Sequence, residues 1–383
     1  MRKMKLLFQL NGYLHGLILG KKSSTCLFQR NILRQILTLL LLFLTNFCFA
    51  QSDSTKALSL SAYAEGYFSY DFSQPKNNEK PNFIYNHKRN KEVQVNLAYV
   101  KARYQKKQVR GNVALMFGNY ARYNLSAEPN WAQAIFEANL GVQLSEKNRI
   151  WLDAGIMPSH IGFESAIGAD CWTLSRSILA ENSPYYESGL KISSTSKNEK
   201  WALAAFVLNG WQRIRGPQTG EWPALGLQIN HQANSEWILN YSNFIGSKKQ
   251  GDQVTWRVFH NFYGIYEANS KMAWILGLDL ATDVDVHNEY GLWFSPVVIG
   301  RYTINPKNKL AARLEYYHDT QQIMVQTLSG KGFQTFGASL NYDYHLKANL
   351  LWRSEIKMYQ SKQAIFDTGN TNYALTTSFC IKI

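Results

Sequence analysis

From residue 57 to residue 383, apolar and polar positions alternate in short segments that are separated by polar connections. Seven connections are short turns, eight are longer, and the two kinds alternate strictly along the chain. The turns are 105–108, 145–149, 195–200, 231–236, 267–271, 305–309 and 345–349, and the long connections are 73–90, 121–130, 158–186, 210–223, 246–252, 283–291, 320–332 and 360–372. Short turns opposite long loops are typical of a barrel that spans the outer membrane. We therefore predict an all-β, up-and-down antiparallel transmembrane barrel of about 16 strands (14 to 18), with periplasmic turns and extracellular loops.

The two faces of each predicted strand differ in polarity. In 57–72, one face is apolar and the other carries Ser59, Glu65, Ser69 and Asp71. The same alternation recurs in 131–144, where Phe136 belongs to the apolar face, and in 333–344. By parity the lumen-facing charges are Arg110, Glu137, Arg257, Asp279, Arg301, Arg313, Glu315 and Arg353. Because Arg or Lys facing lipid at the midplane costs roughly 2 to 4 kcal/mol, we expect these charges to face a water-filled lumen and to stay solvated.

A soluble β-sandwich also alternates, so the aromatic residues provide a second test. They make up 14% of the chain, and many stand beside turns, as the interfacial girdles of membrane barrels do. The final segment, 373–383, is amphipathic and must pair with 57–72 to close the sheet. It is also typical of the signals that the outer-membrane assembly machinery recognises. The expected surroundings of the barrel are therefore outer-membrane lipid.

The first 50 residues have the features of a leader. Residues 36–50 are mostly apolar, follow Arg30 and Arg34, and end at Ala50 before a polar segment. This pattern predicts a secretory signal peptide that is cleaved after Ala50. We expect residues 51–383 to form one barrel domain.

Charge and cysteine content exclude several other classes. The leader holds seven of the 41 Lys and Arg residues, which leaves 34 basic against 27 acidic residues and a net charge of +7. No basic tract of the kind that binds nucleic acid remains, so we exclude that partner. Only Cys171 and Cys380 follow the leader, without metal-ligand spacing, and we expect free thiols. We predict no metal and no cofactor.

Catalytic motifs are missing from residues 51–383. We find no GxSxG, HExxH, CxxC, Walker A or GxGxxG pattern. Ser159 and His160 could suggest a nucleophile and a base, but side chains of adjacent residues rarely face each other. We therefore predict that the chain is not an enzyme.

Two stretches carry a family resemblance. Residues 155–190 combine a Gly and a Pro leaving one strand, then IGFE, then WTLSRSILAENSPYYESGL entering the next. The opening AEGYFSYDF and the later YNHKRNKEVQVNLAYVKARY form the second stretch. Both are similar to the OmpL-like family of β-barrel porins. The resemblance implies a Gram-negative outer-membrane pore for ions and small hydrophilic solutes, and it leaves selectivity open.

The longest connection, 158–186, is the candidate constriction. A loop of this length that folds inward would narrow the aqueous channel of a sixteen-stranded barrel. The candidate constriction residues are Glu164, Asp170, Arg176, Glu187 and Lys191, whose opposed charges could set a transverse field. The alternative is a surface loop with solvated charges.

Passive diffusion is the leading interpretation, and two alternatives remain. One is a structural or adhesive barrel with a plugged lumen, and the other is a barrel enzyme with a Ser/His/acid group at one rim. The oligomeric state also stays open, with a homotrimer among the candidates.

Overall fold

The computed structural model describes residues 57–250, 253–284, 289–327 and 330–383. Residues 57–383 form a compact unit of their own. The predicted leader, with its signal peptide and cleavage site, lies outside the described residues.

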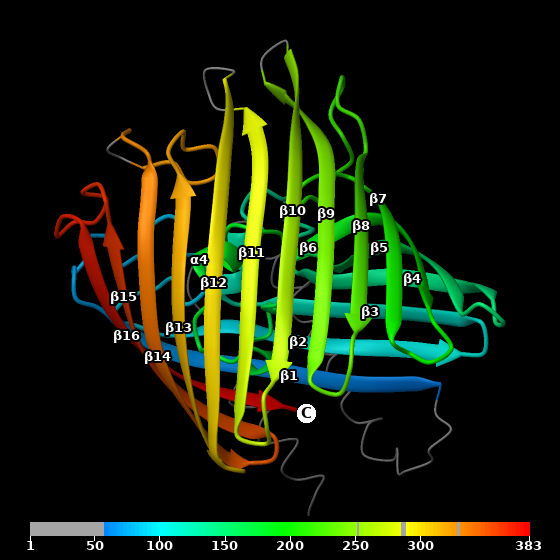
Figure 1. Cartoon of the computed structure of the whole chain (residues 1–383), viewed down its shortest axis with the longest axis horizontal. Coiled ribbons are helices and arrows are strands. Elements are labelled where there is room, and N and C mark those ends of the chain that lie inside the picture. The colour runs from blue at the N-terminus through cyan, green and yellow to red at the C-terminus, as the bar shows by residue number, and fades with distance from the viewer. Residues whose placement is uncertain (1–56, 251–252, 285–288, 328–329) are drawn as a thin grey trace, which may run out of the picture. The chain divides into compact units, whose positions relative to one another are not determined.

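Sixteen antiparallel strands form a single closed sheet in which each strand pairs with its sequence neighbours (Figure 1). The strands are β1 (Leu58–Asp71), β2 (Val93–Lys106), β3 (Val109–Phe117), β4 (Ile135–Ser145), β5 (Ile150–Pro158), β6 (Tyr186–Thr195), β7 (Trp201–Leu208), β8 (Ala224–Gln232), β9 (Trp237–Gln250), β10 (Gln253–Glu267), β11 (Met272–Val284), β12 (Tyr290–Asn305), β13 (Asn308–Asp319), β14 (Phe333–Lys347), β15 (Leu350–Ser361) and β16 (Thr371–Lys382). Each of the seven predicted turns falls between two neighbouring strands. The predicted fold class and the count of sixteen are confirmed.

The barrel closes between its first and last strands. β1 pairs with β16 in a register that runs from Tyr63↔Lys382 to Asp71↔Ala374. The backbone N–H of Ala62 also donates to the carbonyl oxygen of Ile383 at 2.8 Å. Closure satisfies the backbone groups that lipid would leave without partners. The predicted pairing of 373–383 with 57–72 is confirmed.

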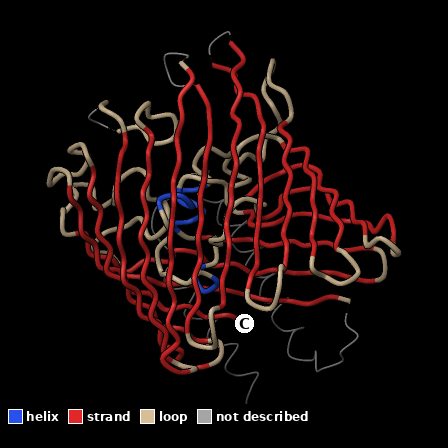
Figure 2. The backbone as a smooth tube through the Cα atoms, in the orientation of Figure 1, coloured by secondary structure: helices blue, strands red, loops and turns tan. Residues whose placement is uncertain are grey.

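Helices are few in the described residues, and all lie in loops (Figure 2). They are α3 (Asn119–Asn124), the 3-10 helix η1 (Gly168–Asp170) and α4 (Ile178–Glu181). None of the described helices is long and apolar enough to cross a membrane.

Two local predictions are wrong. The predicted loop 246–252 is mostly strand, because β9 continues to Gln250 and β10 begins at Gln253. Phe136 was placed on the lipid face, but a β-bulge between β3 and β4 breaks the alternation there. Its ring instead stacks on the inward ring of Tyr99, with centroids 5.0 Å apart. A bulge adds one residue to one strand and so shifts the parity that a sequence pattern assumes.

Side chains from the loops fill part of the barrel interior. One buried apolar cluster joins Phe83 and Ile178 from two loops to Phe259, Trp293 and Tyr317 on the wall. The rings of Trp293 and Tyr317 stack with centroids 5.8 Å apart. The interior therefore contains a packed apolar region as well as polar groups.

Candidate functional site

The connection between β5 and β6, residues 159–185, lies inside the barrel, and we call it the inner loop. Figure 1 shows α4, which belongs to this loop, within the ring of strands, and α4 contacts β12 and β13. Hydrogen bonds of the inner loop as a whole reach inward-facing residues on β1, β6, β8 to β10 and β13 to β16. Strands from most of the circumference therefore hold it in the lumen.

Cationic side chains of β13 and β15 bind backbone carbonyls of the inner loop. Nη1 of Arg313 donates to the carbonyl oxygen of Ser175 at 2.8 Å. Nζ of Lys357 donates to the carbonyl oxygen of Arg176 at 2.9 Å. A hydrogen bond from a charged donor to a carbonyl oxygen is stronger than a hydrogen bond from a neutral donor. The wall thus fixes the loop by its backbone, whatever side chains the loop carries there.

Acceptors on the same strands bind backbone N–H groups of the loop. The N–H of Ser175 donates to Glu355 at 2.5 Å, and the N–H of Ile178 donates to Glu315 at 2.6 Å. The N–H of Leu174 donates to the side-chain oxygen of Asn341 at 3.0 Å. Each of these buried loop amides therefore has a partner, as burial requires.

The opposite end of the loop is held by His160. Its Nδ1 lies 2.8 Å from Oε2 of Glu187, and its Nε2 lies 2.8 Å from the carbonyl oxygen of Asn243. Burial opposes a charged imidazole, but Glu187 and the Asn243 carbonyl together raise the pKa of His160. Ser159 accepts the N–H of Ile161 with its own hydroxyl. His160 is therefore engaged at both nitrogens and is not aligned as a base for Ser159.

The loop between β1 and β2, residues 72–92, also enters the barrel, and we call it the first loop. Oε2 of Glu181 in α4 accepts the backbone N–H groups of Tyr85 at 2.9 Å and Asn86 at 3.1 Å. Nε2 of His87 lies 3.0 Å from Oε1 of Glu65, and both side chains are fully buried. The first loop is thus bound both to the inner loop and to β1.

The five candidate constriction residues fall into two groups. Glu164, Arg176 and Glu187 are at most 9% exposed. Arg176 donates only to backbone carbonyls within the loop, including that of Ser165 at 2.7 Å, so its role is to shape the loop. Asp170 pairs with Lys382 and is 43% exposed, and Lys191 is partly exposed. Only the second group keeps contact with water.

The predicted lumen-facing charges of the wall also differ in how far they are exposed to solvent. The expectation that they stay solvated is wrong for Arg313, Arg353, Glu315 and Asp279, which are at most 2% exposed, and for Glu137, which is 5% exposed. The inner loop covers the first three, and their charges are compensated by partners such as Asp343, which lies 2.8 Å from Arg353. The alternation of residues along a strand cannot show that a distant loop will cover these side chains.

Glu137 and the remaining wall candidates each have an ion-pair partner. Arg110 makes two hydrogen bonds to Asp153, at 2.7 and 2.5 Å. Glu137 accepts from Lys101 at 2.7 Å. The last two pairs are Arg257 with Asp283 at 2.7 Å and Arg301 with Glu267 at 3.3 Å.

The partners Asp153, Lys101 and Lys357 were missed in the sequence. The alternation within 150–158 could have found Asp153, because it lies on the opposite face from the apolar Leu152, Ala154 and Ile156.

A cavity of about 240 Å³ separates part of the inner loop from β4. Phe136 and Glu137 line it on the wall side, and Phe163, Glu164 and Tyr185 line it on the loop side. Within the described part of the chain, no hydrogen bond joins the inner loop to β2, β3 or β4. The loop is therefore least attached where this cavity lies.

The sequence matches one family model over residues 57–383, that of the family described as "Putative beta-barrel porin-2, OmpL-like". The chain belongs to this family. It is accordingly an outer-membrane porin, a barrel through which small hydrophilic solutes diffuse passively. The family resemblance that residues 155–190 and the first hairpin carry is confirmed. Comparison with curated protein sequences finds no match.

Solved porin structures share the fold at low identity. The outer membrane channel DcaP of Acinetobacter baumannii has a TM-score of 0.57 at 12% identity, over 88% of this chain and 100% of that one. The anion-selective porin of Comamonas acidovorans has a TM-score of 0.56 at 8% identity, over 85% of this chain and 99% of that one. OmpT of Vibrio cholerae has a TM-score of 0.54 at 11% identity, over 85% of this chain and 99% of that one.

Proposed function

We propose that the inner loop narrows the lumen of this porin, and that ions and small polar solutes pass between the loop and the wall formed by β2 to β5. The observation that carries this proposal is the uneven attachment of the loop. Its hydrogen bonds go to β13 to β16, β1, β6 and β8 to β10, whereas β2 to β5 receive none within the described residues. The proposed passage runs along the wall to which the loop makes no hydrogen bond within the described residues, and we call β2 to β5 the free wall.

Charges on the free wall keep contact with water. The side chains of Lys101 and Arg110 are 23% and 28% exposed. Their acidic partners, Glu137 and Asp153, are 7% and 9% exposed. A solute at this wall therefore meets more ammonium and guanidinium than carboxylate, which favours anions modestly.

No covalent step is part of the proposal. Ser159 and His160 are the pair that could have suggested catalysis. Both ring nitrogens of His160 bind Glu187 and Asn243, so this histidine holds the loop in place. Structural or adhesive action of the loops is the alternative, and it requires a barrel that does not conduct.

Planar-bilayer recordings of the folded barrel test the proposal. We expect discrete conductance steps, and a reversal potential under a salt gradient that indicates mild anion preference. A variant with a cysteine at Asn112 and another at Asn139, on the free wall, should lose conductance when a bulky thiol reagent is added. Absence of steps in repeated insertions would overturn the diffusion proposal.

We also propose that copies of the barrel associate through the outer face of β1 to β5. That face has an apolar hollow of about 680 Å³, whose lining includes Ala102, Gly111, Ala138 and Ala154. Small residues let backbones in a membrane approach closely. OmpT of Vibrio cholerae, which shares the fold, is known in a trimer form. Cross-linking through a cysteine at Ala102 should yield oligomers, and a cysteine at Leu276 on the far face should not.

A further inference from the structure

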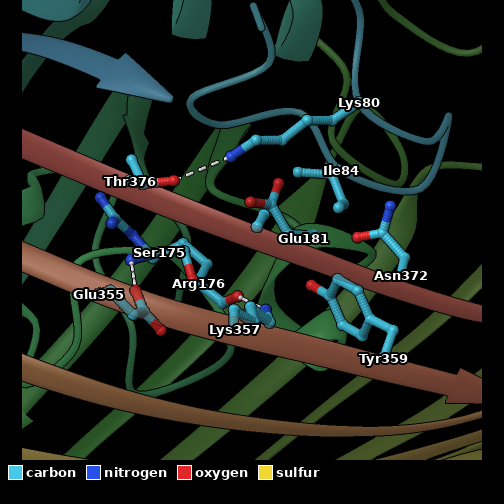
Figure 3. Close-up of a pocket in the computed structure, with 11 residues that line it drawn as sticks. Lys80, Ile84, Ser175, Arg176, Glu181, Glu355, Lys357, Tyr359, Asn372 and Thr376 are labelled. Atoms are coloured by element: carbon cyan, nitrogen blue, oxygen red, sulfur yellow. Dashed lines mark hydrogen bonds between the residues drawn. The ribbon is translucent and has the colours of Figure 1, made fainter. Parts of the chain in front are cut away.

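A small cavity lies where the first loop and the inner loop meet β15 and β16 (Figure 3). Its volume is about 20 Å³. A site needs roughly 10 to 15 Å³ to hold one water-sized particle. Its charged lining consists of Lys80 from the first loop, Arg176 and Glu181 from the inner loop, and Glu355 and Lys357 from β15. The cavity therefore has room for one small particle, and three cationic side chains face two carboxylates around it.

Lys80 is the unusual member of this lining. It is 6% exposed, and its ammonium donates to the hydroxyl of Thr376 at 3.1 Å, as Figure 3 shows. Within the described residues it has no carboxylate at ion-pair distance. Loss of water lowers the pKa of Lys80 to about 8. An ammonium has three N–H donors, so two donors of Lys80 still need acceptors.

The two carboxylates cannot supply those acceptors. Oε1 of Glu355 accepts from Arg313 at 3.1 Å, and its Oε2 accepts the N–H of Ser175. The carboxylate of Glu181 accepts the backbone N–H groups of Tyr85 and Asn86. Both carboxylates are therefore engaged elsewhere, and within the described residues neither lies at ion-pair distance from Lys80.

Lys357 adds further donor capacity. Its ammonium donates to the carbonyl oxygen of Arg176 at 2.9 Å and pairs with Glu315 at 3.1 Å, which leaves one N–H. Lys80 and Lys357 thus both offer N–H donors to the cavity. A buried charge that lacks a partner is costly, so the structure favours an occupant that accepts hydrogen bonds and carries negative charge.

We propose that this cavity binds one small monovalent anion of halide size, held by the ammonium groups of Lys80 and Lys357. The anion supplies the charge partner that Lys80 lacks and ties the first loop to β15. The cavity volume excludes larger organic anions. The first loop is consequently anchored more firmly in chloride than in a salt of a bulky anion.

Anomalous scattering tests occupancy directly. Crystals of the full barrel grown without halide are soaked in sodium bromide, and anomalous differences are measured at the bromine edge. We expect a peak in the cavity between Lys80 and Lys357. No peak there, with a water molecule refined in its place, would overturn the proposal.

Thermal unfolding tests the consequence in solution. The unfolding midpoint of the folded barrel is compared in sodium chloride and sodium gluconate at equal ionic strength. We expect a higher midpoint in chloride for the unmodified chain and for Lys76→Met, which removes an exposed lysine from the same loop. Lys80→Met should lose the chloride effect. If Lys80→Met fails to fold, Thr376→Val weakens the same site, and an undiminished chloride effect in either variant would contradict the proposal.

Discussion

Arg353 on β15 donates from Nη1 to the carbonyl oxygen of Gly168 at 2.6 Å, so a wall side chain holds the inner loop by its backbone. Its Nη2 reaches the carbonyl oxygen of Cys171 at 2.9 Å. Its guanidinium also pairs with Asp343 at 2.8 Å, and Arg353 itself is fully buried. One arginine thus compensates a carboxylate of the wall and positions the loop segment around η1.

Replacing Arg353 by methionine should destabilise the barrel and release this segment. The change leaves Asp343 without its buried counter-ion, and removal of one partner of such a pair costs roughly 3 to 5 kcal/mol. Urea unfolding of the folded barrel measures the loss, and bilayer recordings should show larger or noisier steps. Arg103→Met is the control, because the Arg103 side chain is exposed near the periplasmic end and donates to the exposed Gln105. Equal losses in the two variants would contradict the anchoring role.

Stability should depend on pH through His160. The charged imidazole is favoured in the fold, so the folded pKa lies above the ordinary value of 6.5. A folded pKa above the unfolded one means that the folded state binds more protons in the interval between them. The contribution of His160 is therefore complete below pH 6.5 and is lost as pH rises through its folded pKa. Unfolding of His160→Gln at several pH values should lack this component, and identical pH dependence in both proteins would refute it.

The barrel itself could be predicted because its pattern is local. Lipid and water select opposite faces of every strand, so alternation and turns reveal sixteen strands without any knowledge of distant contacts. The errors also have local causes. Phe136 turns inward because a bulge adds one residue, and β9 and β10 extend to Gln250 and from Gln253 because these polar segments pair with each other.

The site could be predicted only in part, because its contacts join residues far apart in the sequence. Arg313 and Ser175 are 138 positions apart, and Ser175 and Glu355 are 180 apart. Parity placed Arg313 and Glu315 on the inner face, but no periodic pattern indicates which loop will cover them. The same limit explains why Lys80 could not be recognised as buried.

Selectivity should respond to the two constriction candidates that keep contact with water. Asp170→Asn removes a half-exposed carboxylate, and we expect the reversal potential to shift towards anions. Lys191→Met removes a cation beside the free wall, and we expect the opposite shift. Glu236→Gln, in a periplasmic turn, is the control and should cause no shift. Shifts of the same sign for Asp170→Asn and Lys191→Met would show that charge at these positions does not act on the passing ions.

Gly277 on β11 gives the inner loop room for an aromatic ring. A Cβ at this position would lie 2.3 Å from Cε1 of Phe163, closer than real Cβ contacts come. Gly277→Ala should therefore displace Phe163 and its edge contact with Tyr263, whose ring centroid lies 5.8 Å away. Overpacking of this kind costs about 1 to 3 kcal/mol.

The double variant Gly277→Ala with Phe163→Ala separates the clash from other effects. Removal of the ring leaves space for the new methyl group, so the alanine at 277 should cost much less in the Phe163→Ala background. The difference between the two costs, measured by urea unfolding, is the coupling between wall and loop. Larger conductance should accompany Gly277→Ala, because the ring that leaves β11 is one of the contacts that position the loop. If Gly277→Ala costs the same in both backgrounds, the glycine serves the strand alone, and Phe163 does not depend on it for its place in the lumen.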